Sequence, residues 1–130
     1  MTNYIVRIIE KEIKENLSQF PVVTLTGARQ TGKTTLLNHI LGKEYEYFDL
    51  DDLRIQGIVK RDPMLFISEI KNKAVIYEIQ YAPELLHYIK IKVDENPEIK
   101  GRFVLTGSQR FLMMKNLSET LAGRVGIVDL

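Results

Sequence analysis

Cysteine is absent from this 130-residue sequence, which excludes disulfide bridges, thiolate zinc sites and cysteine nucleophiles. No apolar run approaches the ~20 residues that a helix needs to span a bilayer, so we expect no membrane contact. Neither sign of charge is in excess, because 18 Lys and Arg residues are balanced by 17 Asp and Glu residues, and the composition therefore does not support nucleic acid as a partner. Residues 1–16 are too rich in charge for a signal peptide, and we expect a cytoplasmic protein.

The apolar residues of the chain recur with the spacings of alternating helices and strands. The helices predicted from this pattern cover residues 3–19, 33–41, 51–70 with an interruption at Pro63, a segment that begins at Pro83, and 111–121. The predicted strands cover residues 22–26, 45–50, 74–79, 102–106 and 125–130. Such alternation is typical of a parallel sheet with helices on both faces, so we expect one α/β domain over residues 1–130, a three-layer sandwich around a five-stranded sheet.

Two of the predicted strands close with the same tripeptide, Leu25-Thr26-Gly27 and Leu105-Thr106-Gly107. The repetition is either a coincidence or a sign that the two strand ends lie side by side beneath one ligand, where glycine lets the backbone approach closely. The second interpretation predicts that the 102–106 strand neighbours the 22–26 strand.

Residues 27–34 match the pattern G-x-x-x-x-G-K-[ST] at every fixed position, between a predicted strand and a predicted helix. The residues that we expect to bind a nucleotide here are Gly27, Ala28, Arg29, Gln30, Thr31, Gly32, Lys33, Thr34 and Thr35. The glycines allow a tight loop whose backbone N–H groups surround phosphate oxygens, and the positive end of the following helix adds to the same site. The alternative, a glycine loop with a purely structural role, is disfavoured by this strand and helix context.

The last two residues of the motif carry its chemistry. Lys33 supplies a mobile positive charge for the β- and γ-phosphates, and we expect it to serve both binding and catalysis. Thr34 offers its hydroxyl to magnesium (Mg2+), which otherwise keeps mostly water as ligands. The motif therefore predicts a P-loop that binds a nucleoside triphosphate together with Mg2+.

Hydrolysis of that nucleotide requires a carboxylate near the metal and a group that orients the attacking water. The predicted strand 74–79 supplies a single carboxylate, Glu78, directly after four apolar or aromatic residues. Glu78 is therefore the candidate catalytic carboxylate of this strand.

Four blocks of sequence together resemble one family. These blocks are residues 27–37, 78–86, 105–109 and 121–124. In their order and spacing they are similar to the AAA-type ATPases of bacteria and archaea in which the ATPase module precedes a C-terminal nuclease-like domain, and the similarity covers essentially the whole chain. The resemblance implies ATP as the nucleotide, a sheet of order 5-1-4-3-2, and a chain that is the N-terminal part of a longer protein. It also implies a partner, either further copies of the chain or the C-terminal domain.

One departure from the family pattern bears on activity. The family normally has Asp-Glu where this sequence has Tyr77-Glu78, and the following Pro83-Glu84 fixes that register. Glu78 then corresponds to the glutamate that polarises water, and Tyr77 stands at the position of the magnesium aspartate. Because tyrosine is bulky, neutral at pH 7 and a poor ligand for magnesium, we expect ATP binding with weak or absent hydrolysis.

Other polar residues receive a role from the resemblance, each with an alternative. Ser108 follows the fourth strand, where related ATPases place a sensor of the γ-phosphate; alternatively, it caps the next helix. Arg124 resembles a catalytic arginine that approaches the phosphates in its own chain or from a neighbouring subunit; alternatively, it is a plain surface residue. Asp49, Asp51 and Asp52 are expected to start a helix, or one of them supports magnesium.

Two other functions stay open. A P-loop kinase for a small molecule would usually carry an arginine-bearing lid after the helix that follows the third strand, and residues 95–102 are too few for one. It would also place the 74–79 strand directly beside the 22–26 strand. A non-catalytic module whose interactions are gated by nucleotide differs from the ATPase only in turnover, and Tyr77 makes it a serious alternative.

Overall fold

The computed structural model describes residues 3–27, 33–108 and 110–130. The strands in these ranges are β1 (Val22–Thr26), β2 (Tyr45–Asp49), β3 (Lys73–Tyr77), β4 (Phe103–Gly107) and β5 (Val125–Asp129). The helices are α1 (Asn3–Gln19), α2 (Lys33–Ile40), α3 (Leu53–Arg61), α4 (Pro63–Ser68), α5 (Leu85–Glu95) and α6 (Arg110–Thr120), with a 3₁₀ turn, η1, at Ile79–Tyr81. These boundaries agree closely with the predicted ones, except that β3 ends at Tyr77 and not at the predicted Ile79.

The five strands form one parallel sheet in the order β2-β3-β4-β1-β5. This is the predicted order 5-1-4-3-2 counted from the other edge, and the prediction is confirmed. Because β4 lies between β1 and β3, the third strand is not the direct neighbour of the strand that leads into the P-loop. The arrangement is the one we expected for the AAA-type class and differs from the one that we expected for a kinase.

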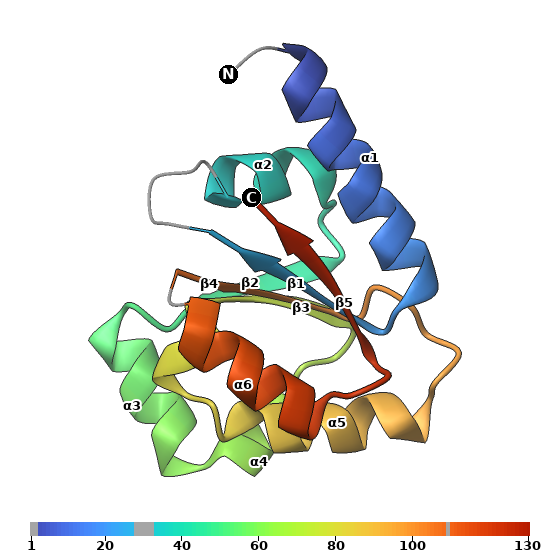
Figure 1. The fold of residues 1–130 in the computed structure, drawn as a ribbon. Coiled ribbons are helices and arrows are strands. Elements are labelled where there is room, and N and C mark those ends of the chain that lie inside the picture. Colours follow the sequence, from blue (N-terminus) through green and yellow to red (C-terminus); the bar gives the residue numbers. More distant parts are fainter. Residues whose placement is uncertain (1–2, 28–32, 109) are drawn as a thin grey trace.

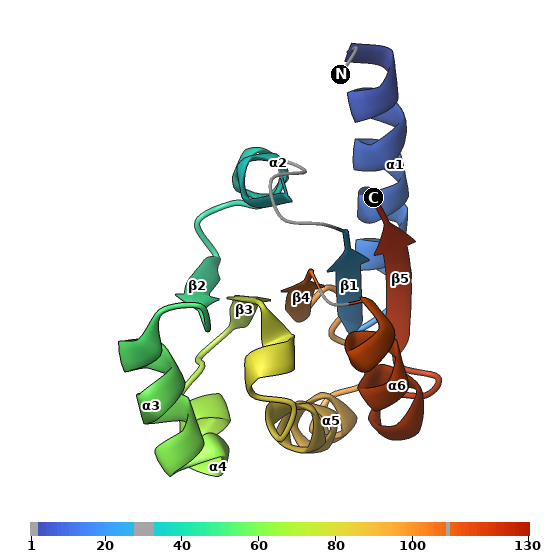
Figure 2. The ribbon, with the colours of Figure 1, turned by 60° about the vertical axis from the view of Figure 1, so that its left-hand side comes forward.

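Helices cover both faces of the sheet and complete the three-layer sandwich (Figures 1 and 2). On one face, α1 and α2 bury Ile13 and Leu37 against Val23, Leu25 and other side chains of the strands. On the opposite face, α3 to α6 pack over a larger apolar cluster centred on Ile76, Phe103 and Leu105. Successive strand residues alternate between these two clusters, as the period of a β-strand requires. The sheet is therefore buried on both sides.

Burial differs between the middle and the edges of the sheet. All five residues of β1 and all five of β4 are buried, which fits the lack of charged residues in both segments of the sequence. The edge strands β2 and β5 have exposed residues at alternate or consecutive positions and are correspondingly less apolar. The central position of β1 and β4 gives the loops at their carboxyl ends a rigid base.

The carboxyl ends of β1 and β4 lie next to each other, as the repeated Leu-Thr-Gly tripeptides suggested. Leu25 is paired with Thr106, and Thr26 with Gly107, so that the two tripeptides are offset by one residue. The N–H of Gly27 donates to the carbonyl oxygen of Gly107 at 3.3 Å. The first glycine of the P-loop is thus held directly against the end of β4.

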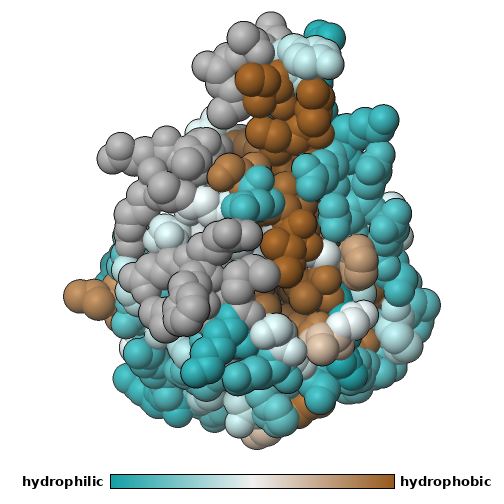
Figure 3. Space-filling model, in the orientation of Figure 1, coloured by the Kyte–Doolittle hydropathy of each residue, from teal (hydrophilic) through white to brown (hydrophobic). Residues whose placement is uncertain are grey.

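Apolar side chains also reach the surface along one side of the molecule. Figure 3 shows an apolar stripe that runs down α1 and continues over the body of the protein. Among the exposed large apolar residues are Ile5 and Ile8 on α1 and Ile127 on β5. Even so, within residues 3–27, 33–108 and 110–130 no helix combines the length and the apolar character that crossing a membrane requires.

The close packing of α1 on the edge strand β5 depends on Gly126. A Cβ atom at this position would lie 2.2 Å from Asn16 Oδ1 and 2.5 Å from Phe20 Cδ2, both of which sit at the end of α1. We expect Gly126→Ala to lower the free energy of unfolding by about 1–3 kcal/mol, because either these side chains or the helix must move. Urea unfolding of the purified variant measures this difference.

Gly57 in α3 provides the matched control, since a Cβ atom there would meet nothing within 4 Å. In a helix interior alanine is favoured over glycine, so Gly57→Ala is expected to raise the free energy of unfolding by about 0.5–1 kcal/mol. The same chemical change is therefore predicted to act with opposite signs at the two glycines. Equal effects at both positions would contradict the packing of α1 on β5.

Candidate nucleotide-binding site

The P-loop motif lies between the buried strand β1 and the helix α2, as its sequence context predicted. Thr26 ends β1, Lys33 begins α2, and Thr34 and Thr35 are exposed in the first turn of that helix. The first turn of α2 contains no acidic residue, so nothing within it opposes an anion at the positive end of the helix. The predicted phosphate contacts of Ala28 to Gly32 lie outside the described residues.

Glu78 has a backbone conformation that is unusual for its residue type. Its φ and ψ angles are 60° and 54°, in the left-handed region that disfavours residues with a Cβ atom. This conformation turns the chain out of β3 and into η1, which is why the predicted strand end at Ile79 is wrong. The side chain of Glu78 is 8% exposed and lies at the carboxyl edge of the sheet. Strain retained at a buried acid is typical of functional positions.

The strain at Glu78 can be measured with two variants that both remove its carboxylate. We expect Glu78→Gly to be more stable than Glu78→Ala by about 1 kcal/mol, because glycine adopts a positive φ without steric cost while alanine does not. Comparing the two free energies of unfolding isolates the backbone term. An alanine variant as stable as the glycine variant would contradict the left-handed conformation.

Ser108 is brought to Glu78 from the neighbouring strand. Its hydroxyl donates to Glu78 Oε1 at 2.8 Å, and the backbone N–H of Glu78 donates to Thr106 Oγ1 at 3.3 Å. Gln80 Nε2 in turn donates to Ser108 Oγ at 3.4 Å. The end of β4 therefore holds the acid in place, and the Ser108 hydroxyl is directed at Glu78. Its predicted roles, sensing of the γ-phosphate or capping of α6, stay predictions.

Two members of this network, Thr106 and Gln80, were not among the predicted site residues. Thr106 could have been found from the repeated tripeptide, which placed it at the carboxyl edge. Gln80 carried no signal from spacing, because its approach to Ser108 depends on the turn η1 and on a contact between residues 28 positions apart.

Tyr77, the last residue of β3, is almost fully buried on the face of the sheet that α2 covers. It is 9% exposed and belongs to the apolar cluster that includes Leu37 of α2 and Leu41, which directly follows that helix. Its ring stacks on Tyr47 of β2 with 6.5 Å between centroids and 18° between planes. Burial, with smaller contributions from Tyr47 and Asp49, raises the pKa of Tyr77 to about 12. The phenol is therefore protonated and neutral at physiological pH.

A magnesium ion is implied by the P-loop, and the described side chains fit it only in part. Thr34 is exposed at the start of α2, and its role as a ligand stays a prediction. Tyr77, which the family resemblance aligns with a metal carboxylate, is a buried neutral phenol that has neither the charge nor the ligand strength. No cluster of three or more acidic or histidine side chains suitable for a metal occurs within the described ranges. Tyr77 does not fit a metal site.

The acidic residues at the end of β2 and directly after it form hydrogen bonds with the local backbone. Asp52 is the N-cap of α3, where its carboxylate accepts from the N–H of Arg54 at 2.9 Å and also bonds the Arg54 guanidinium. Asp49 Oδ1 accepts from the N–H of Asp51 at 2.9 Å. These contacts support the interpretation of the cluster as a helix start.

Arg124 directly precedes β5 and lies at the amino ends of the strands, whereas the P-loop motif follows the carboxyl end of β1. Its carbonyl oxygen accepts from the N–H of Val22, the first residue of β1, and its guanidinium forms two bonds with Asp94, of 2.7 and 2.9 Å. Hydrogen bonding to Arg124 lowers the pKa of Asp94. A five-residue strand separates its amino and carboxyl ends by roughly 15 Å, so the structure does not bring Arg124 to the phosphates of its own chain. Action on a neighbouring subunit stays a prediction.

A parallel sheet in which β4 separates β1 from β3, together with a G-x-x-x-x-G-K-T segment that joins β1 to α2, defines the fold of P-loop nucleoside triphosphatases. The family described as AAA domain matches residues 19–130, and the chain belongs to that family. It is thus a P-loop module of the AAA type.

Relatives among known proteins are consistent with this assignment. The mycobacterial proteins Rv2008c of Mycobacterium tuberculosis and Mb2031c of Mycobacterium bovis, both named as uncharacterized, are each 36% identical to the chain over 119 residues. The match covers 91% of this chain but 26% of each of theirs, so the chain spans about a quarter of the length of these relatives.

Solved structures extend the likeness in fold. The Walker-type ATPase PABY2304 of Pyrococcus abyssi aligns with a TM-score of 0.63 at 18% identity, over 94% of this chain and 52% of that one. A DNA polymerase III gamma-subunit-related protein of Thermotoga maritima aligns with a TM-score of 0.51 at 12% identity, over 96% and 45%. At these identities the similarity concerns the fold alone.

Proposed function

We propose that the chain binds ATP at residues 27–35 and that it hydrolyses ATP weakly or not at all. The observation that carries the proposal is the buried, neutral Tyr77 on the α2 face at the carboxyl end of β3. An ATPase of this class requires a negative group there to order the metal and its water. A phosphate site formed by the P-loop, without that group, favours binding over turnover.

The hydrogen-bonded pair of Glu78 and Ser108 also supports the proposal. Glu78 has the chemistry of a general base, and the bond from Ser108 holds it at the edge of the sheet from which the P-loop emerges. The acid that would polarise water is therefore retained, while the residue expected to place the metal is replaced. Loss of one component with retention of the other is consistent with slow turnover and not with loss of nucleotide binding.

The position of Arg124 at the amino ends of the strands supports a role for it in an oligomer of this chain. In a homo-oligomer, an arginine at the amino edge of one subunit can complete the phosphate site of the next. We include this arrangement, a cytoplasmic location and a further C-terminal domain in the proposal. The 26% coverage of the mycobacterial relatives is consistent with such a domain.

One observation bears on each of the two alternative functions, the small-molecule kinase and the non-catalytic interaction module. The kinase is disfavoured because β4 intervenes between β1 and β3. A nucleotide-gated interaction module without turnover is favoured by Tyr77, and it differs from the leading proposal only in the rate of hydrolysis.

Calorimetric titration with ATP and with ADP, paired with an assay of phosphate release, tests the proposal. We expect both nucleotides to bind with a stoichiometry near one and the release of phosphate to stay close to the rate without protein. Absence of binding by both nucleotides would contradict the proposed function. Multiple turnover by the isolated chain would contradict the role given to Tyr77.

A further inference from the structure

The hydroxyl group of Tyr77 is a buried polar group whose presence needs an explanation. It is inaccessible to solvent and has no hydrogen-bond partner within the described part of the chain. Buried hydroxyl groups are normally paired, because leaving one unpaired costs free energy. A phenylalanine would fill the same space without that cost. The free-energy cost suggests that the hydroxyl serves something other than packing.

The location of this hydroxyl separates it from comparable buried atoms. Within the described residues, Thr24 Oγ1 inside β1 and Arg102 Nε before β4 are likewise unpaired, but both lie away from the carboxyl edge of the sheet. Gln80 Oε1 is also unpaired near this edge, but it belongs to η1, beyond the end of β3. Tyr77 ends β3 at that edge and lies on the face covered by α2. Figure 2 shows α2 over this face of the sheet. The hydroxyl therefore lies at the same end of the strands and on the same face of the sheet as the start of α2, where we expect the P-loop motif to bind phosphates.

The stacking partner of Tyr77 lies on the side away from the strand that leads into the P-loop. Tyr47 stacks on the ring from β2, the outer strand that neighbours β3 on the side away from β1. The strands between Tyr77 and the P-loop are β4 and then β1, a lateral separation of about 10 Å between β3 and β1. The ring is thus supported on one side by Tyr47, and β1, which leads into the P-loop, lies on its other side.

The chemistry of a phenol matches one class of ligand at this position. A protonated phenol donates a hydrogen bond, and a phosphate oxygen accepts one, with extra strength because the acceptor is charged. An aspartate in the same place has no proton to donate and repels phosphate unless a cation lies between them. Burial keeps the pKa of Tyr77 near 12, so that the donor persists across the physiological range of pH.

We propose that Tyr77 Oη donates a hydrogen bond directly to a phosphate oxygen of the bound nucleotide, and that the site thereby accepts a nucleoside polyphosphate that carries no metal. The inference rests on the proposed ATP binding and goes beyond it, because it turns Tyr77 from a missing metal residue into a phosphate ligand. Substrate recognition would then use a phenol where related sites use an aspartate and magnesium.

Tyr77→Phe tests the proposal, since it removes the hydroxyl and keeps the ring, its burial and its stack on Tyr47. In buffer with EDTA, the variant is expected to bind ATP about tenfold more weakly than the wild type, or weaker still, as for loss of a bond to a charged acceptor. Its unfolding midpoint without nucleotide should equal or exceed that of the wild type, because the lost hydroxyl had no partner. A role confined to structure would instead lower the midpoint.

Tyr47→Phe is the matched control, because it removes the hydroxyl of the stacked neighbour, and its ATP affinity in EDTA should match that of the wild type. Equal affinities of Tyr77→Phe and wild type in EDTA would overturn the proposal while leaving ATP binding intact. A weakening seen only with magnesium would overturn it as well, since the hydroxyl would then act through the metal. If neither wild type nor Tyr47→Phe binds ATP, the proposed function itself fails.

Discussion

Lys33→Ala is expected to fold normally and to bind ATP at least about tenfold more weakly than the wild type, a loss of roughly 1.4 kcal/mol or more. The triphosphate would lose its main counter-charge, which the backbone dipoles of the loop do not replace. Isothermal titration calorimetry gives the affinity, and far-UV circular dichroism with a thermal melt shows whether the fold is retained.

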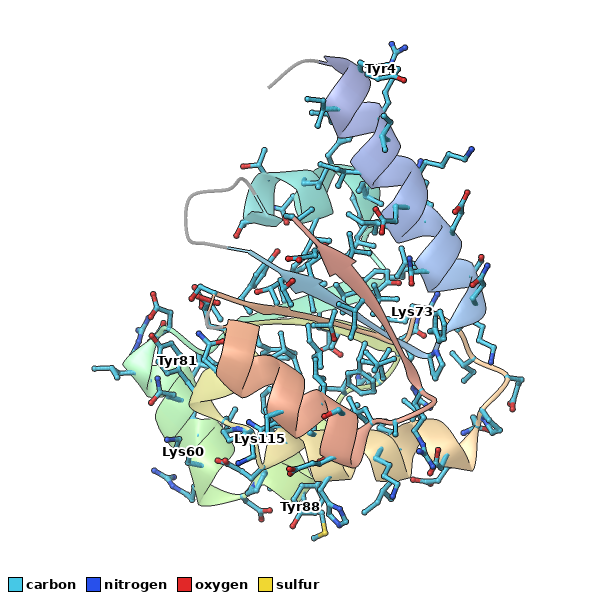
Figure 4. The ribbon with its side chains drawn as sticks, in the orientation of Figure 1. Tyr4, Lys60, Lys73, Tyr81, Tyr88 and Lys115 are labelled. Carbon is cyan, nitrogen blue, oxygen red and sulfur yellow. The ribbon has the colours of Figure 1, made fainter. Side chains whose placement is uncertain are left out.

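Lys60→Ala is the matched control for this prediction. Lys60 lies on α3, which packs on the opposite face of the sheet from α2 (Figure 4). The control makes the same change in side chain and in net charge, so a general electrostatic effect would weaken both variants alike. Unchanged affinity in Lys33→Ala, or equal losses in both variants, would contradict the P-loop assignment.

Tyr77→Asp is expected to convert ATP binding from metal-independent to metal-dependent. A carboxylate at the end of β3 repels phosphates in EDTA and attracts magnesium when the ion is supplied. We therefore expect weaker ATP binding than wild type in EDTA, at least about tenfold tighter binding with magnesium than without it, and faster phosphate release. Affinity is the primary readout, because release also depends on any arginine supplied by a neighbouring subunit.

Tyr77→Asn separates charge from shape in this experiment. It has nearly the same size as the aspartate and loses the same aromatic packing, which is expected to cost about 3 kcal/mol or more of stability in both variants. Only the aspartate variant should gain a response to magnesium. If wild type, Tyr77→Asp and Tyr77→Asn respond to magnesium alike, Tyr77 is not at the metal position, and Glu78 becomes the candidate metal carboxylate.

Much of the fold was predictable because it follows from local patterns. The continuous burial of β1 and β4 appears in the sequence as short apolar runs, and the alternation of these runs with helices requires a parallel sheet. The repeated Leu-Thr-Gly ends and the family resemblance were enough to place β4 beside β1, which the pairing of Thr26 with Gly107 confirms.

The parts of the site that could not be predicted depend on contacts between distant residues or on strain. Glu78 is a residue type that avoids a positive φ, so its left-handed conformation runs against local preference, and the predicted strand continued through it. The bonds of Ser108 to Glu78 and of Arg124 to Asp94 each join residues 30 positions apart. Such contacts exist only after the sheet has formed, and no local pattern in the sequence specifies them.

Some properties of Tyr77 could be predicted from the sequence, and others depend on the folded structure. Its residue type and its register with the following Pro83-Glu84 were sufficient to question a metal site. Its burial on the α2 face, its stack on Tyr47 and its unpaired hydroxyl are properties of the folded chain. Together they replace the expectation of a defective metal site with a specific expectation about how phosphate is bound.

The most direct test of this account is the dissociation constant of the wild-type chain for ATP, measured by calorimetry once with magnesium and once with EDTA. The account predicts clear binding under both conditions, with affinities that differ by less than about threefold, or roughly 0.7 kcal/mol. Binding that requires magnesium, seen as a loss of about tenfold or more in EDTA, would contradict it.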